Sequence, residues 1–406
     1  MFSSLYPLYI DPGTGSMLFS LFVSLVAAGY FLFRALIIKV KFAFPGKRAA
    51  EPGFFFVIYN EARQYWCVFK PILDEFERRK IPVRYLTSVK EDPFFDCAYS
   101  HISGEYIGAG NRAFARLNFL EADVCLMTTP GLEVYQLKRS KFVRHYSHIL
   151  HDTGDATCYR LFGIDWFDSI LLSGEYQIAG IRDLERIRST RRKELPVIGS
   201  TYLDMYREVL SSLPGEDDHP FTVLVSPTWG PGSLLNVWGP ALLDPLLETG
   251  WRIILRPHPQ SKTSEAALLA RLEERYKNSP GLEWDHNAEN ITTLAKSDVM
   301  VSDFSGVIFD FAFLFNRPIF YSHSSFNPEM YDAGDLDRPL WKFDAVKAFG
   351  LEIGDPAALP RRIHQALSGG GLGEEREKAK NTAWQNPGGA AAGAVDFLVK
   401  VKETLG

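Results

Sequence analysis

The chain has few cysteines and no strong charge bias. Only four of its 406 residues are cysteines (Cys67, Cys97, Cys125 and Cys158), and they lie far apart, without a CxxC pair. This spacing argues against a disulfide framework or a zinc site and favours reduced thiols in a cytosolic compartment. The formal net charge of −5 excludes a global attraction to nucleic acid or anionic lipid, and nucleic acid is not an expected partner. Any anion-binding site must therefore be built locally.

Basic residues are missing from the start of the chain. No lysine or arginine precedes Arg34, and the run from Ser16 to Phe33 carries no charge at all. Because about 20 apolar residues span a bilayer as a helix, we predict one transmembrane anchor over about residues 16–38. The positive charges follow the run, so the catalytic part is expected on the cytoplasmic side of the inner, cytoplasmic membrane as a single-pass protein. A cleaved signal peptide would need a basic start, and a buried hydrophobic helix is the remaining alternative.

Apolar strands alternate with amphipathic helices along the rest of the sequence. The alternation restarts after the polar segment "LPGEDDHP" at 213–220, which reads as a linker. Strands separated by helices indicate parallel sheets covered by helices on both faces. We therefore predict an α/β, GT-B-like fold with two doubly wound Rossmann-type domains and a cleft between them. The expected parts are the anchor segment 1–50, an acceptor-side domain 51–213, a nucleotide-donor domain 214–370 and a helical segment 371–406.

The stretch "VSDFSGVIFDFAFLFNRPIFY" (301–321) places polar residues between an apolar strand and an apolar helix. The turn contains Ser302, Asp303, Ser305 and Gly306. Hydroxyls, backbone N–H groups and a helix N-terminus together favour a phosphate site, with simple N-capping as the alternative. Asp310 lies between two phenylalanines, where a carboxylate is costly to bury without partners. We expect it to support the site by accepting backbone hydrogen bonds from a neighbouring loop.

Two further loops are expected at the same sheet edge. In "RPHP", the prolines hold Arg256 and His258 at the end of a strand. There, arginine can make a bidentate contact with a phosphate, and histidine can donate a hydrogen bond to an oxyanion. A surface turn with a solvated histidine is the alternative. In "SPTWGPGSL", Thr228 and Trp229 could contact a phosphate or a base, although a helix-entry turn explains this loop nearly as well.

The segment "HYSHILHDTGD" supplies a candidate base from the other domain. Strand alternation would put His145 and His151 on one face and His148 on the other, which argues against a three-histidine zinc site. His151 ends the strand, where a general base would face the cleft. The "DLD" pair Asp335 and Asp337 only superficially matches a metal-binding DxD, so no metal and no cofactor are expected.

Taken together, these motifs resemble the CDP-glycerol glycerophosphotransferases of teichoic-acid and capsule synthesis. The resemblance rests on "SPTW", "RPHP" and the 301–321 stretch, which follow one another along the chain in this order, and it covers about residues 54–367. It implies a transferase with a GT-B fold, and the membrane anchor predicted from the uncharged run fits such an enzyme. Such an enzyme moves glycerol phosphate, or a related polyol phosphate, from a CDP-polyol to a hydroxyl of a lipid-linked cell-envelope polymer and releases CMP.

The resemblance also implies residue roles. The base of the family lies in a His-Gly-Thr setting, which His151 matches, although Asp152 stands in the glycine position. His151 and His258 are then the catalytic residues, and the donor phosphate would lie against Arg256, Ser302 and Ser305. An acidic neighbour raises the proton affinity of the base and repels an anionic polymer, so CDP-ribitol is an alternative donor. Two different functions would also fit these motifs: a glycosyltransferase that uses a nucleotide sugar, and a non-catalytic envelope-assembly scaffold.

Overall fold

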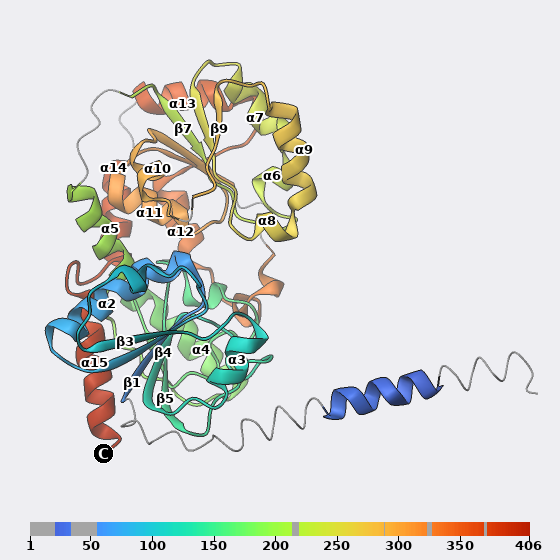
Figure 1. Cartoon of the computed structure of the whole chain (residues 1–406). Coiled ribbons are helices and arrows are strands. Elements are labelled where there is room, and N and C mark those ends of the chain that lie inside the picture. The colour runs from blue at the N-terminus through green and yellow to red at the C-terminus, as the bar shows by residue number, and fades with distance from the viewer. Residues whose placement is uncertain (1–20, 34–54, 213–218, 288, 323–326, 369–371) are drawn as a thin grey trace, which may run out of the picture. The chain divides into compact units, whose positions relative to one another are not determined.

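The computed structural model describes residues 21–33, 55–212, 219–287, 289–322, 327–368 and 372–406 (Figure 1). The chain divides into two compact units, Met1–Gly53 and Phe54–Gly406. In the first unit, residues 21–33 form a helix whose residues are all exposed. Across the described ranges, no helix has both the length and the apolar character needed to cross a membrane. The rest of the predicted anchor, residues 16–20 and 34–38, lies outside the described residues.

The second unit begins with a six-stranded parallel sheet in the order β3-β2-β1-β4-β5-β6. Its strands are β1 (Phe56–Asn60), β2 (Val83–Thr87), β3 (Ile102–Tyr106), β4 (Ala122–Met127), β5 (Val143–Ile149) and β6 (Ser169–Leu171). All residues of β1 are buried: Phe56 and Ile58 belong to one core cluster, whereas Val57 and Tyr59 belong to another. A central strand that is apolar on both faces requires helices on both sides of the sheet. We call this part, with its helices, the first lobe.

A second six-stranded parallel sheet has the order β12-β11-β10-β7-β8-β9. Its strands are β7 (Thr222–Val225), β8 (Arg252–Leu255), β9 (Leu282–Trp284), β10 (Val299–Ser302), β11 (Ile319–Tyr321) and β12 (Leu351–Glu352). Counted from its own first strand, each sheet follows the order 3-2-1-4-5-6, which is that of a Rossmann fold. The predicted pair of parallel α/β domains is therefore confirmed, and we call the second one the second lobe.

Helices fill the connections in both lobes (Figure 1). Those of the first lobe are α2 (Trp66–Arg78), α3 (Asn111–Leu117), α4 (Ile178–Arg188) and α5 (Thr201–Ser212). Those that follow β7 are α6 (Leu234–Val237), α7 (Pro240–Leu247), α8 (Ser261–Ser264), α9 (Ala266–Tyr276), α10 (Ile291–Ala295), α11 (Val307–Phe315), α12 (Trp341–Phe349), α13 (Leu359–Ser368), α14 (Gly373–Ala383) and α15 (Ala390–Thr404).

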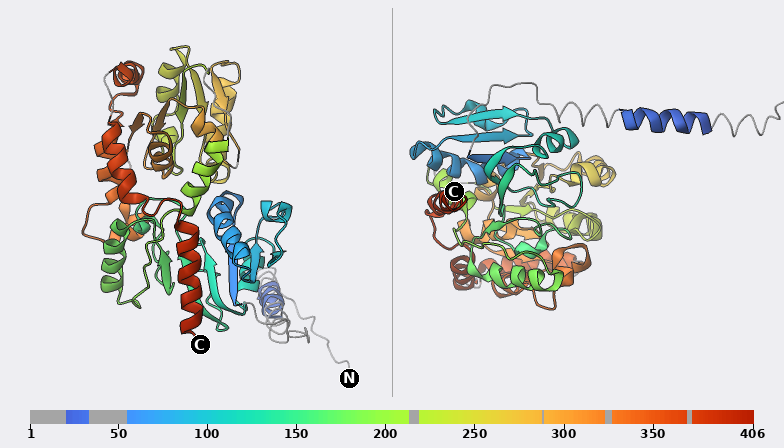
Figure 2. Two further views of the ribbon diagram at one scale, coloured as in Figure 1. Left: turned by 90° about the vertical axis from the view of Figure 1, so that its left-hand side faces the viewer. Right: turned by 90° about the horizontal axis from the view of Figure 1, so that it is seen from below.

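The last helix returns to the first lobe. The sequence predicts helix over 373–405, but the chain turns between Ala383 and Ala390, and α15 then packs along α2. Figure 2 shows this contact from the side, with α15 in red and α2 in blue. An ion pair of 2.5 Å joins Arg79 at the end of α2 to Asp396 of α15. The unit Phe54–Gly406 therefore contributes both its first strands and helices and its last helix, α15, to the first lobe.

A stretch of the second lobe also fastens onto the first. In this bridging segment, residues 327–342, Asp332 donates its N–H to the carbonyl of Tyr159 at 2.8 Å. Asp332 and Asp335 both pair with the buried guanidinium of Arg188, at 2.8 and 2.5 Å. Asp335, one half of the "DLD" pair, thus serves in an ion pair between the lobes. This fastening holds the carboxyl edges of the two sheets in a fixed relation.

Candidate functional site

His151 lies two residues after the end of β5, in contact with aromatic side chains. Its Nδ1 is 3.1 Å from the hydroxyl of Tyr159, and its ring lies 4.8 Å from the ring of Tyr65. Burial lowers the pKa of His151, and the neighbouring Asp152 carboxylate opposes this shift. A histidine that is neutral near pH 7 can accept a proton, as a general base requires.

The hydroxyl of Tyr159 also reaches a second histidine. It lies 3.1 Å from Nε2 of His148, whose own Nδ1 is buried without a hydrogen-bond partner. Burial lowers the pKa of His148 to about 3, so this ring is neutral. Strand alternation predicted that His148 and His151 face opposite ways, and this is wrong. The chain leaves the strand after Ile149, so alternation no longer applies at His151.

In the second lobe, Asp303 organises the turn at the end of β10. Its two carboxylate oxygens accept the N–H groups of Thr228 at 2.8 Å and Leu234 at 3.1 Å, so it ties down the "SPTWGPGSL" loop from both sides. Burial raises the pKa of Asp303 to about 6. Ser302 is also fully buried, and its hydroxyl donates to the carbonyl of Ser226 at 2.6 Å. Both side chains therefore shape the loop pair in this structure.

The turn meets the first lobe at Gly306, the residue before α11. A Cβ at Gly306 would lie 3.3 Å from both Cβ and Oδ2 of Asp152. The helix N-terminus is thus in direct contact with the residue that follows the candidate base. Gly306 is the N-cap of α11 and provides no side-chain cap. Because Gly306 contacts Asp152, the N-terminal end of this helix lies beside the Asp152 side chain. The two halves of the predicted site are brought together here.

The "RPHP" loop contributes Arg256 and His258 in different ways. Arg256 is buried and donates to the carboxylate of Asp285 at 2.5 Å and to the carbonyl of Asn287 at 2.8 Å. Its guanidinium is therefore held against the 285–287 loop, and the predicted phosphate contact stays a prediction. Sequence reasoning did not single out Asp285, because a carboxylate after a short strand is common.

His258 has a defined tautomer. Its Nδ1 accepts the N–H of Gln260 at 3.1 Å, so in the neutral ring Nε2 carries the proton. Burial lowers its pKa to about 4, and His151 and Arg256 act in the same direction. His258 is thus a neutral hydrogen-bond donor, and its pKa is coupled to the protonation of His151 in the other lobe. Its ring lies 6.4 Å from Trp229, whose indole is covered at 5.2 Å by the guanidinium of Arg160 from the first lobe.

Sequence reasoning missed Lys342. This lysine is buried at the start of α12, and its ammonium donates to the carbonyl of Phe304 at 2.8 Å, within the "SDFSG" turn. Its backbone N–H, like that of Trp341, is accepted by the carboxylate of Asp155 from the first lobe, at 2.8 and 3.1 Å. Lys342 therefore places a positive charge at the turn where the sequence predicted an anion. No local motif marks it, because the contact spans 38 residues.

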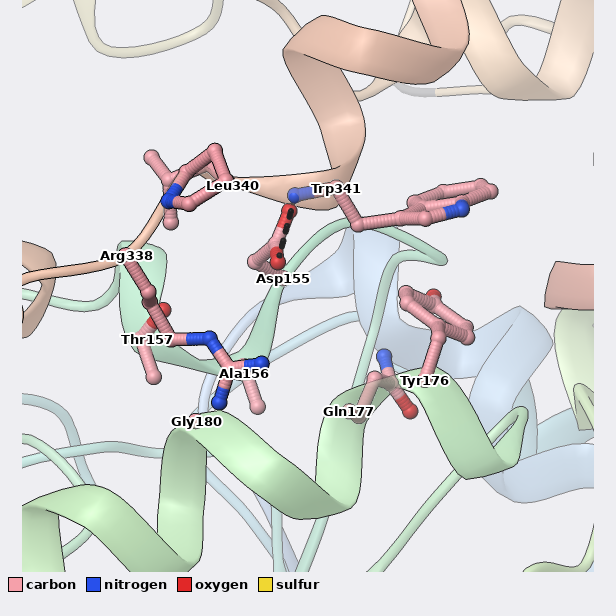
Figure 3. A pocket seen from close by; sticks show the side chains of 10 residues that line it. Asp155, Ala156, Thr157, Tyr176, Gln177, Gly180, Arg338, Leu340 and Trp341 are labelled. Carbon is pink, nitrogen blue, oxygen red and sulfur yellow. Dashed lines mark hydrogen bonds between the residues drawn. The ribbon is translucent and has the colours of Figure 1, made fainter.

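Beside Asp155 lies a small pocket of about 40 Å³ (Figure 3). It is lined by side chains from both lobes, with Tyr176 and Gln177 on one side and Arg338 and Trp341 on the other. Gln177 donates to the carbonyl of Gly154, and Arg338 pairs with Asp183, so these polar groups already have partners. We read the pocket as part of the join between the lobes.

Asp310 supports the site from behind. It accepts the hydroxyl of Tyr202, from α5, at 2.9 Å, in place of the backbone groups that the sequence predicted. Burial raises the pKa of Asp310 to about 7, and the charge of Asp152 adds to this shift. The bond connects α11 to the helix that leaves the first lobe. Asp310 thus fixes the helix whose N-terminus faces Asp152.

The two parallel α/β domains give the protein a GT-B-like fold. The wall teichoic acid polymerase TagF shares the fold, with a TM-score of 0.58 and 14% identity over 94% of this chain and 97% of that one. The UDP-GlcNAc 2-epimerase of Methanocaldococcus jannaschii also shares it, with a TM-score of 0.54 and 13% identity over 85% of this chain and 99% of that one. Curated protein sequences gave no match.

A model of a protein family matches part of the chain. Residues 204–333 match the family described as CDP-Glycerol:Poly(glycerophosphate) glycerophosphotransferase. Over these residues, the match confirms the resemblance that the motifs predicted. The matched region contains "SPTW", "RPHP" and the "SDFSG" turn, whereas His151 lies outside it.

Proposed function

We propose that the protein transfers glycerol phosphate, or a related polyol phosphate, from a CDP-polyol to a hydroxyl of a lipid-linked cell-envelope polymer and releases CMP. One observation carries this proposal: Gly306, at the N-terminus of α11, lies against Asp152, the residue next to His151. A donor phosphate bound at the turn would therefore lie close to a base supplied by the other lobe. Phosphoryl transfer requires this positioning more than it requires covalent help.

In the proposed step, His151 takes the proton of the acceptor hydroxyl through Nε2. The acceptor oxygen forms a bond to the β-phosphorus, and the bond from that phosphorus to the oxygen of the CMP phosphate breaks. For Nε2 to be free, Nδ1 of His151 must carry the proton and donate it to Tyr159, whose hydroxyl then donates to Nε2 of His148. The low pKa of His148 is compatible with this acceptor role.

Charge neutralisation on the donor is assigned to three groups. The N-terminus of α11 and the ammonium of Lys342 lie at the turn, and the Nε2–H of His258 is a neutral donor. Together these groups can stabilise the charge that develops on the transferred phosphate and on CMP. Thr228, Trp229 and Ser305 complete the proposed donor side, while Asp303 and Asp310 hold its backbone in place.

Attachment to the cytoplasmic membrane is part of the proposal. The support is the uncharged run from Ser16 to Phe33, in which residues 21–33 form an exposed apolar helix. An exposed apolar helix is stable in contact with acyl chains and costly in water. A lipid-linked acceptor would then share the membrane with the enzyme.

The test is an assay of CMP release with purified full-length protein, a lipid-linked acceptor, and CDP-glycerol or CDP-ribitol. We expect CMP with at least one donor, and a loss of at least about 100-fold in kcat for His151→Ala, as expected for removal of a general base. His364→Ala is the control, because this exposed histidine lies on α13, outside the proposed site.

Absence of CMP release with every CDP-polyol would overturn the proposal. Full activity of His151→Ala would leave the donor assignment intact and refute the base. Nucleotide binding without turnover would indicate a scaffold instead.

A further inference from the structure

The amino edge of the first sheet, opposite the candidate site, carries an unusual set of exposed aromatic side chains. Phe55, Phe119, Phe142 and Trp166 are 50%, 45%, 46% and 50% exposed. Each lies one to three residues before a strand, namely β1, β4, β5 and β6. Because these strands are parallel and adjacent, the four side chains come from one edge of the sheet. We call this set the aromatic edge.

Contacts between neighbouring strand starts confirm that the members lie side by side. The carbonyl of Phe55 accepts the N–H of Val124, and the carbonyl of Phe142 accepts the N–H of Ala122. The carbonyl of Trp166 accepts Arg139, which also pairs with Asp168 at the start of β6. The set is thus a continuous rim of the lobe.

Cations accompany the aromatic rings. Lys141 lies 4.9 Å from the ring of Phe142, and Lys402 of α15 lies 4.4 Å from the ring of Phe55. Arg191 and Arg192 are exposed just before Glu194, which pairs with the start of β6. Glu121 and Glu194 are the exposed acidic residues beside the same strand starts. Exposed aromatic rings interleaved with lysine and arginine are typical of surfaces that lie in the headgroup region of a bilayer.

The course of the chain points to the same occupant. Phe55 precedes β1 at this edge, and residues 34–54 separate it from Phe33, the end of the uncharged run. A chain of that length reaches at most about 70 Å, so a membrane that holds the run is within reach of the edge. Lys39, Lys41, Lys47 and Arg48 lie in this connection and add to its attraction for anionic headgroups.

We propose that the aromatic edge is a membrane-docking surface that rests on anionic lipid headgroups. The inference builds on the membrane attachment proposed above and adds which face meets the bilayer. The carboxyl edge with His151 then opens away from the membrane, where a soluble nucleotide donor can enter. Docking of this kind fixes the orientation of the first lobe relative to the membrane, which attachment through an anchor alone does not define.

The test uses the full-length protein with vesicles of phosphatidylglycerol and phosphatidylcholine in which a fraction of the acyl chains is brominated. Bromine quenches tryptophan only at short range, and Trp166 is the one exposed tryptophan among the described residues. We expect quenching in the wild type and its loss in Trp166→Phe. Trp284→Phe is the matched control and should quench like the wild type, since Trp284 belongs to β9 of the second lobe.

Charge is tested separately. Quenching at increasing lipid concentration gives the apparent affinity for anionic vesicles. Lys141→Glu combined with Arg192→Glu should lower this affinity by about tenfold or more, as expected for two cations near a charged surface. Equal quenching of wild type and Trp166→Phe would overturn the docking surface. The docking surface would also be overturned if the protein formed a dimer through the aromatic edge, detected by light scattering without lipid, and showed no quenching with vesicles.

The measurement needs no donor or acceptor. Quenching without CMP release would therefore refute the proposed reaction alone, and CMP release without quenching would refute the docking surface alone.

Discussion

Asp152 and Gly306 touch across the two lobes, since a Cβ at Gly306 would lie 3.3 Å from Cβ and Oδ2 of Asp152. A carboxylate thus lies at the helix end where a phosphate is expected to bind. Any donor must bind beside this charge or displace it. Asp152 is also the residue that departs from the family's His-Gly-Thr pattern, so this departure lies between the proposed base and the proposed donor turn.

Replacing Asp152 should strengthen nucleotide binding. We expect Asp152→Gly to lower the Kd for CMP by about tenfold, because one repulsive charge is removed near the phosphate. Calorimetric titration with CMP measures this. Asp152→Asn separates charge from size and should recover most of the gain. Gly306→Ala should weaken binding in the wild type and less so in the Asp152→Gly background, where the neighbouring side chain is gone. Unchanged affinity in Asp152→Gly would show that the carboxylate lies off the phosphate path.

Tyr159→Phe should impair the base without affecting donor binding. The hydroxyl is the hydrogen-bond partner of Nδ1 in His151, so its loss removes the group that selects the tautomer with Nε2 free. We expect kcat to fall about 10- to 100-fold with the KM for the donor unchanged. Tyr106→Phe, at an exposed position on β3, is the control. A change in KM alone would contradict a role in positioning the base.

Lys342→Met should weaken binding of the donor. Methionine fills a similar buried volume but removes the ammonium that donates to Phe304 in the turn. We expect the Kd for CMP to rise about tenfold, the effect of losing one charge-assisted contact to a phosphate. Lys347→Met, on the exposed face of the same helix, should bind CMP like the wild type. Comparable affinity of both variants would remove Lys342 from the donor site.

Asp310→Asn should become more stabilising as the pH rises. Burial raises the pKa of Asp310 from 3.8 to about 7, so its ionisation lowers the free energy of unfolding as pH increases from about 4 to 7. Asparagine still accepts the hydroxyl of Tyr202 but cannot ionise. The melting temperature of the variant minus that of the wild type should therefore increase over this window and level off above pH 7. The stabilisation has an upper bound of about 4 kcal/mol.

Thermal melts from pH 4 to 8.5 measure this difference. Asp337→Asn, at an exposed position, is the control and should show a difference that does not vary with pH. A flat difference for Asp310→Asn as well would mean that Asp310 does not change its proton in this range.

The sequence predicted features that depend on neighbours along the chain. The central strands are apolar on both faces, and the turn at Ser302–Gly306 sits between a strand and a helix, so fold class and motif positions followed from local patterns. The break between α14 and α15 also has a local signal, since "NPGG" at 386–389 cannot continue a helix. Element types are thus readable where periodicity and turn residues agree.

Long-range pairings could not be predicted in this way. The sequence did not indicate that Arg256 pairs with Asp285, a carboxylate 29 residues away. Lys342 reaches the turn only because Asp155, from the other lobe, fixes the start of α12. The position of this lysine therefore depends on how the lobes are joined, which the local patterns of a single sequence do not reveal.

The return of α15 to α2 has a consequence for biosynthesis. Ala394, Val395 and Leu398 of α15 are buried in the same core cluster as Phe69 and Ile72 of α2. During translation this face of α2 stays uncovered until α15 has left the ribosome, after the whole second lobe. The first lobe is thus completed only after the second lobe has been synthesised, and an apolar face of α2 stays exposed while the second lobe folds.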